Sequence, residues 1–266
     1  MTSGHVQSAG ARLAFRVDGE AGRPWLLLSN SLAADHRMWD DQIAMLTRTH
    51  RVLRYDTRGH GASDAPAGPY DFAMLVADMV ALLDHVGAGR ADMMGLSLGG
   101  MTALGLGLAH PARCGTLIVC DARADAPAPF VASWDDRIAA IAAGGMAAIL
   151  EGTLARWFTP ACPAGVRARA AEMILTTPVA GYAGCAAALK GLDYLRHLPG
   201  MSPPVRYLGG AEDMGAPRAA MEAMAAATPD AQAVFLPGLA HIPNMEDPAA
   251  FEAAVAPWLR DAAARP

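Results

Sequence analysis

The 266-residue chain has few cysteines, no run of basic residues and no long apolar stretch. Its four cysteines show neither a Cys-x-x-Cys pair nor a Cys/His spacing typical of zinc sites, so we expect buried thiols and no metal. Lysine and arginine are scattered and the formal net charge is -5, which argues against a nucleic-acid or membrane surface. No stretch reaches the ~18 apolar residues of a membrane span, and no apolar signal-peptide core follows the polar start. We therefore expect a cytoplasmic protein.

Apolar residues, in contrast, are abundant. They make up 53% of the chain, enough for one large core, with or without an inserted subdomain. Short apolar runs alternate with segments of helical periodicity such as residues 72–86. This alternation predicts an α/β fold with a mostly parallel, eight-stranded sheet and helices on both faces. Near the start, the runs at residues 13–17 and 25–29 flank a glycine-rich turn and are expected to form a hairpin.

The alternation stops between Asp121 and Pro199, where helical segments follow one another without a strand. We expect four helices there, one of them capped by Ser133 at its amino end. The chain is accordingly divided into a first core part at residues 1–122, a helical lid at 123–200 and a second core part at 201–266.

A glycine-flanked serine marks the candidate reactive centre. Residues 95–99 read Gly-Leu-Ser-Leu-Gly after an apolar run and before a helical one, which is the pattern of a nucleophile elbow around Ser97. The glycines Gly95 and Gly99 leave room for the sharp strand-to-helix turn that exposes the serine oxygen. In a chain with 27 glycines the same pattern can also arise as a plain structural turn, so its context matters.

Two later loops supply that context. Asp213 follows the first strand expected after the lid, and His241 follows the last one. A solvated acid or a surface histidine would be the ordinary interpretation of either residue alone. The order Ser97, Asp213, His241 is nevertheless the order of an α/β-hydrolase triad. Asp121 and Glu212 compete with Asp213 for the role of the acid, and whether Asp121 takes part in catalysis stays open.

An oxyanion hole in this arrangement uses two backbone N–H groups. One is expected from Leu98, directly after the nucleophile. The other is expected from the loop after residues 25–29, and we assign it to Ser31.

Five stretches of the chain carry a more specific resemblance. They are Ser29-Asn30-Ser31-Leu32, Arg37-Met38-Trp39-Asp40, residues 53–63, residues 95–101 and the Gly-Tyr-Ala-Gly-Cys run at 181–185. Together they resemble the 3-oxoadipate enol-lactonases of aromatic catabolism, members of the α/β-hydrolase fold family. Most hydrolases of this fold have His-Gly where this chain has Ser29-Asn30.

The resemblance implies hydrolysis of 3-oxoadipate enol-lactone to 3-oxoadipate through an acyl-serine intermediate, without cofactor or metal. Its substrate is a small anion, and because the protein has a net negative charge we expect a local cation in the lid. Arg137, one helical turn from Trp134, and Lys190, at the end of the helix with the Gly-Tyr-Ala-Gly-Cys run, are the candidates. Trp134 is expected either in the pocket wall or in the lid core.

Other functions use the same residues. A broad-specificity carboxylesterase or a cofactor-free perhydrolase would have the same triad, and a non-catalytic module would bind a ligand without turnover. Dehalogenase or epoxide hydrolase chemistry is disfavoured, because those enzymes have an aspartate at the position of Ser97. The sequence leaves the oligomeric state open.

Overall fold

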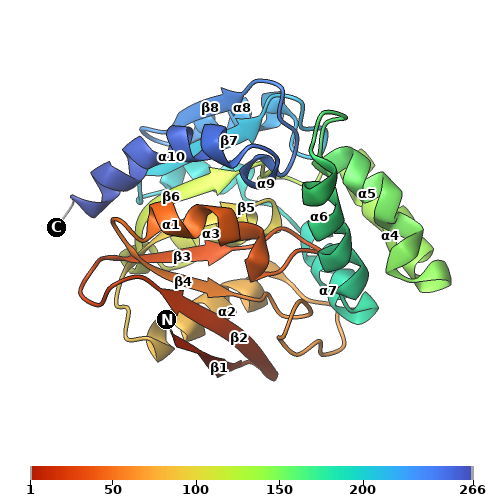
Figure 1. Cartoon of the computed structure of the whole chain (residues 1–266), viewed down its shortest axis with the longest axis horizontal. Coiled ribbons are helices and arrows are strands. Elements are labelled where there is room, and N and C mark those ends of the chain that lie inside the picture. The colour runs from red at the N-terminus through yellow and green to blue at the C-terminus, as the bar shows by residue number, and fades with distance from the viewer. Residues whose placement is uncertain (1, 265–266) are drawn as a thin grey trace.

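A computed structural model describes residues 2–264 and has an eight-stranded sheet at its centre (Figure 1). The strand order is β1-β2-β4-β3-β5-β6-β7-β8. The pairs β1/β2 and β2/β4 are antiparallel, and the five pairs from β4/β3 to β7/β8 are parallel, which confirms the predicted α/β-hydrolase fold class. The strands are β1 (Thr2–Ser8), β2 (Ala11–Asp18), β3 (Trp25–Ser29), β4 (Arg51–Tyr55), β5 (Ala91–Leu96), β6 (Cys114–Cys120), β7 (Val205–Gly210) and β8 (Gln232–Leu236).

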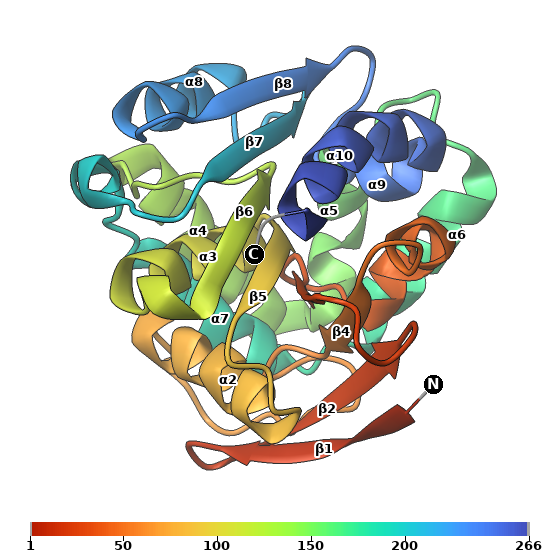
Figure 2. The same ribbon diagram turned by 90° about the vertical axis from the view of Figure 1, so that its left-hand side faces the viewer.

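Helices cover both faces of the sheet (Figure 2). On one face lie α2 (Phe72–His85), α3 (Leu98–Ala109) and α8 (Arg218–Ala227), and on the other α1 (Ile43–Leu46) and α10 (Pro248–Ala263). Every residue of the central strands β5 and β6 is buried. This explains why these strands are continuous apolar runs and not alternating ones, since both of their faces lie against helices.

The predicted hairpin between residues 13–17 and 25–29 is wrong. The strand β2 pairs with β1 and β4, whereas β3 lies beyond β4 and pairs with β4 and β5. The hairpin partner of β2 is β1, an edge strand whose side chains are mostly exposed or half-buried. Because such a strand needs no apolar face, residues 2–8 lack the apolar pattern from which a strand is predicted.

Four helices lie between β6 and β7, as expected: α4 (Ala128–Gly144), α5 (Leu150–Trp157), α6 (Ala164–Thr176) and α7 (Val179–Lys190). We call these the lid helices; the division of the chain at residues 123 and 200 stays a prediction. Ser133 is not a helix cap, because α4 begins at Ala128 and the Ser133 hydroxyl donates to the Phe130 carbonyl at 2.8 Å. None of the helices in residues 2–264 is long and apolar enough to cross a membrane.

The helix α7 packs backbone against backbone on the loop after β4. A Cβ on Gly181 would lie 2.0 Å from the carbonyl oxygen of Gly59, and one on Gly184 would lie 2.6 Å from the ring of Tyr70. The two glycines of the Gly-Tyr-Ala-Gly-Cys run are thus required by close approach. All four cysteines are buried and free, as predicted.

Candidate active site

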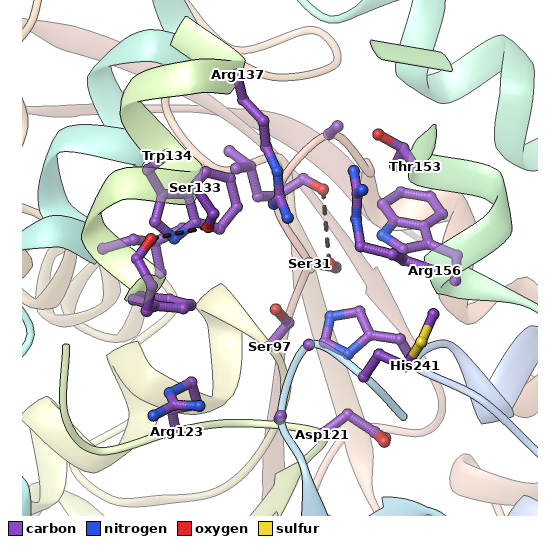
Figure 3. A pocket seen from close by; sticks show the side chains of 18 of the residues that line it. Ser31, Ser97, Asp121, Arg123, Ser133, Trp134, Arg137, Thr153, Arg156 and His241 are labelled. Carbon is purple, nitrogen blue, oxygen red and sulfur yellow. Dashed lines mark hydrogen bonds between the residues drawn. The ribbon is translucent and has the colours of Figure 1, made fainter. Parts of the chain in front are cut away.

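Ser97 lies in a strained turn between β5 and α3. Its backbone has φ 55° and ψ -116°, a conformation that residues other than glycine rarely adopt. A Cβ on Gly95 would lie 2.3 Å from the carbonyl oxygen of Gly99, and one on Gly99 would lie 2.2 Å from that of Ser29. Only glycine fits at either position. This is the geometry of a nucleophile elbow, and Ser97 lines a pocket next to His241 (Figure 3).

His241 and Asp213 form a hydrogen-bonded pair at the ends of β8 and β7. His241 Nδ1 lies 2.8 Å from Asp213 Oδ2, and Asp213 Oδ1 accepts from the Gly215 N–H at 2.6 Å. Burial alone would raise the pKa of Asp213, but the contact with His241 and the N–H groups of Gly215 and Ala216 outweigh it and lower the pKa. The structure therefore pairs an ionised carboxylate with the histidine, in the arrangement predicted for these two residues.

Asp121 is a second buried acid beside this pair. Its Oδ1 accepts from the Gly210 N–H at 2.7 Å, and Oδ2 is buried without a hydrogen-bond partner. One ligand atom each from Asp121, Asp213 and His241 lies within 4.8 Å of the other two. Burial and the nearby Asp213 charge raise the pKa of Asp121 well above its usual range. The hydrogen bond to His241 is thus made by Asp213 and not by Asp121, which lies behind the pair, whereas Glu212 is exposed.

The loop after β3 contains Ser31, one of the two predicted oxyanion-hole residues. The Ser31 N–H donates to Met38 Sδ at 3.4 Å, and the Ala33 N–H donates to His60 Nε2 at 2.9 Å. The N–H of Leu32, between them, has no partner within residues 2–264, and Leu32 lines the pocket. The predicted donor, the Ser31 N–H, is thus already engaged within the loop, and the free N–H of Leu32 is the candidate second donor of an oxyanion hole. Leu98 starts α3, so its N–H is one of the unpaired amides of a first helical turn.

The pocket above Ser97 has a volume of about 340 Å³ and is lined on one side by residues of the lid helices. Side chains from two of the lid helices point into it. Trp134 and Arg137 come from α4, with the Arg137 guanidinium 4.2 Å from the centre of the Trp134 ring. Thr153 and Arg156 come from α5 (Figure 3). The structure thus brings the predicted residues Trp134 and Arg137 to the pocket.

The sequence prediction missed Arg156. Burial and the neighbouring Arg137 charge lower the pKa of this guanidinium, so two cations lie close together in the pocket. A signal existed, because Thr153, Arg156 and Trp157 have the i, i+3, i+4 spacing of one helix face. Lys190, in contrast, is not among the residues that line the pocket, and its ammonium pairs with Asp135. The prediction that Lys190 binds substrate is therefore not supported by the structure.

Among residues 2–264, two clusters of acids and histidine have ligand atoms close enough for one cation. One is the group of Asp121, Asp213 and His241. The other is Asp35, His36 and Asp56, in which His36 Nδ1 lies 2.8 Å from Asp56 Oδ1 and Asp35 pairs with Arg37. Hydrogen bonds and ion pairs within the chain thus already engage the atoms of the second cluster.

Comparisons with known proteins place this geometry in a family. Residues 24–248 match the alpha/beta hydrolase fold family. The 3-oxoadipate enol-lactonase 2 of Acinetobacter baylyi is 34% identical over 247 residues, 91% of each chain. Among solved structures, the enol-lactonase of Burkholderia xenovorans LB400 is 35% identical, with a TM-score of 0.91 over 97% of this chain and 100% of that one.

A hydrolase of Pseudomonas aeruginosa is 40% identical, with a TM-score of 0.91 over 97% of this chain and 98% of that one. Each likeness extends over at least 91% of both proteins. The chain therefore belongs to the α/β-hydrolase fold family and is similar to its enol-lactonase members.

Proposed function

We propose that the protein is a serine hydrolase that opens a small carboxylated enol-lactone, converting 3-oxoadipate enol-lactone to 3-oxoadipate in the cytoplasmic catabolism of aromatic compounds. The observation that carries the proposal is a group of hydrogen-bond donors opposite Ser97 that lack an acceptor or a counter-ion. Trp134 Nε1 and Thr153 Oγ1 are buried without partners. Arg137 hydrogen-bonds to Tyr182, but neither Arg137 nor Arg156 forms an ion pair within residues 2–264. Donors without acceptors in a pocket are costly unless a ligand supplies the acceptor. A carboxylate supplies it.

The catalytic steps follow from the triad. His241 takes the proton of Ser97 while the serine oxygen attacks the lactone carbonyl carbon. The negative charge that forms on the carbonyl oxygen is stabilised by the N–H groups of Leu32 and Leu98. Asp213 holds His241 in the tautomer with the proton on Nδ1 and stabilises the imidazolium.

Collapse of the tetrahedral intermediate breaks the ring C–O bond and expels an enolate. An enolate is a better leaving group than an alkoxide, so this step needs less help from the proton on His241. The enolate takes up on carbon the proton that His241 received from Ser97, which yields the ketone and returns His241 to its neutral form. Formation of the ketone removes the tethered nucleophile and prevents ring closure. Water activated by His241 hydrolyses the acyl-serine, returning the proton to Ser97 Oγ and releasing the second carboxylate.

The test is hydrolysis of 3-oxoadipate enol-lactone beside a neutral ester, p-nitrophenyl acetate. We expect turnover of both, with a higher kcat/KM for the lactone. Ser97→Ala and His241→Ala should each lower kcat by about 10⁴-fold or more, and the double variant should be little worse than either single one, because the residues act as a unit. Turnover that survives Ser97→Ala would contradict the serine mechanism.

A broad-specificity carboxylesterase or perhydrolase remains the alternative. The aromatic side chains of Phe130, Trp134 and Trp157 in the pocket wall favour it, because they would also accept a neutral acyl group. A kcat/KM for the neutral ester equal to that for the lactone would support this alternative.

A further inference from the structure

A buried histidine lies directly behind the loop proposed as the oxyanion hole. His60 belongs to the loop after β4 and has an exposed fraction of 0%. Its Nε2 accepts from the Ala33 N–H at 2.9 Å, and its Nδ1 lies 3.1 Å from the carbonyl oxygen of Arg58. Since a carbonyl oxygen only accepts and an amide N–H only donates, the proton must be on Nδ1 and Nε2 must be bare. The contacts define one neutral tautomer.

The surroundings of His60 keep it neutral. Burial lowers the pKa of the imidazole, although the Arg58 carbonyl and the charges of Asp56 and Asp35 act in the opposite direction. Asp56 accepts from His36 and from the Ala62 N–H, and Asp35 pairs with Arg37, so neither acid hydrogen-bonds to the His60 ring.

Ala33, which donates to His60, is in an unusual conformation. Its φ is 65°, in the left-handed region that a residue with a Cβ adopts only under strain. The Ala34 N–H closes the same turn on the Ser31 carbonyl at 3.1 Å. In this turn the amides on either side of Leu32 are both engaged, and the Leu32 N–H is left for the pocket. The Leu32 N–H belongs to the peptide unit between Ser31 and Leu32, whose carbonyl the Ala34 N–H holds. The acceptor on His60 holds the next peptide unit through the Ala33 N–H, and so fixes the turn in which the Leu32 amide lies.

We infer that His60 is a positioning residue, which fixes the strained turn at Ala33 and so aims the Leu32 N–H at the oxyanion. The inference rests on the proposed function, because an oxyanion forms only if Ser97 attacks a carbonyl. His60 lines no part of the pocket, so its effect reaches the substrate only through the backbone of the turn.

Three substitutions separate this role from simple core packing. His60→Gln places an acceptor and a donor at nearly the spacing of the two ring nitrogens, so it can serve both Ala33 and Arg58. His60→Asn keeps a donor at the Nδ1 position but is too short to reach Ala33. His60→Leu removes both hydrogen bonds while filling a similar volume. The readouts are kcat and KM for p-nitrophenyl acetate and for the enol-lactone.

We expect kcat to fall at least tenfold in His60→Asn and His60→Leu, with KM changed by less than about threefold, because an oxyanion contact acts in the transition state and not in substrate binding. His60→Gln should recover most of kcat. An unchanged kcat in His60→Asn, or equal losses in the Asn and Gln variants, would overturn the inference. If His60→Leu fails to fold, the Asn and Gln pair still decides.

Nitrogen NMR of the wild-type imidazole gives a readout without turnover. We expect His60 to have a protonated Nδ1 and a bare Nε2, and a proton on Nε2 would overturn the inference. A wild-type protein that hydrolyses neither compound would remove the proposed function, and this inference with it. Wild-type activity together with an unchanged His60→Asn variant would remove this inference alone.

Discussion

Three arginines line the pocket, and Arg123 among them pairs with Asp125. Replacing Arg156 by methionine removes one of the other two cations while keeping an unbranched apolar stem. Arg156 is half-buried, forms no ion pair within residues 2–264 and lies close enough to Arg137 for that charge to lower its pKa. The substitution therefore breaks no ion pair inside the protein. Its effect on catalysis should come from the ligand.

The expected magnitude follows from the partial burial of the guanidinium. A hydrogen bond to a charged group contributes about 1.5–3 kcal/mol, equivalent to about 10- to 150-fold in rate. Arg156 is only half-buried, so we expect the lower end, about tenfold in kcat/KM for the enol-lactone. Removing Arg156 also relieves the repulsion on Arg137. The double variant with Arg156→Met and Arg137→Met should therefore lose less kcat/KM for the enol-lactone than the product of the two single losses.

The assay compares kcat/KM for the enol-lactone with kcat/KM for p-nitrophenyl acetate in each variant. Arg156→Met and Arg137→Met should lower the first value and leave the second within about twofold. Lys190→Met is the matched control, because this lid cation pairs with Asp135 and does not line the pocket. It should change neither value.

Either of two results would contradict recognition of the substrate carboxylate by Arg137 and Arg156. If Arg156→Met and Arg137→Met leave the ratio of the two kcat/KM values unchanged, the pocket does not recognise a carboxylate through these residues. An effect of Lys190→Met as large as that of Arg156→Met would show that the lid acts through its total charge and not through contact.

Three further results are expected. Asp213→Asn should lower kcat by about 10⁴-fold in steady-state assays, because an amide cannot hold His241 in the required tautomer; a mild effect would reopen the assignment of the acid. Asp121 keeps a proton in the folded state that the unfolded chain releases above its usual pKa of 3.8, so wild-type stability should fall as pH rises from there. In urea unfolding, the free energy of unfolding of Asp121→Asn should rise relative to that of wild type by up to ~1.4 kcal/mol per pH unit. Plots of the two free energies against pH that run parallel would contradict this. Gly181→Ala should lower Tm by several degrees, whereas Gly165→Ala, with nothing within 4 Å of its added Cβ, should not.

The elbow and the order of strands and helices could be predicted because both are local. A serine between glycines at the end of an apolar run, and an acid and a histidine after later runs, are visible within a few residues each. The pairing of β2 could not be predicted, because β4 enters the sheet beside it from far along the chain. The alternation of residues 13–17 says that a strand forms and does not say what lies next to it.

The choice between Ser31 and Leu32 as the oxyanion donor could not be made from the sequence for a similar reason. Which amide of the loop after β3 stays free depends on the left-handed turn at Ala33, and that turn is held by His60, which follows on another loop. For the lid, spacing within one helix brought Trp134 and Arg137 to the pocket and could have indicated Arg156. Lys190 was chosen for its place in a motif, but that motif serves the contact between α7 and the core.

The contact of α7 with the loop after β4 means that the lid helices are not equally free to adapt. Tyr182 and Leu189 on α7 form one wall of the pocket, and a shift of α7 toward the loop after β4 drives Gly181 into the backbone of Gly59. In α4 and α5 the glycines Gly144 and Gly152 meet only side chains, which can yield. Adaptation of the pocket to a substrate of another size would therefore have to come from α4 and α5. Evolution or design can reshape this arginine-bearing side of the pocket while the opposite wall on α7 keeps its position.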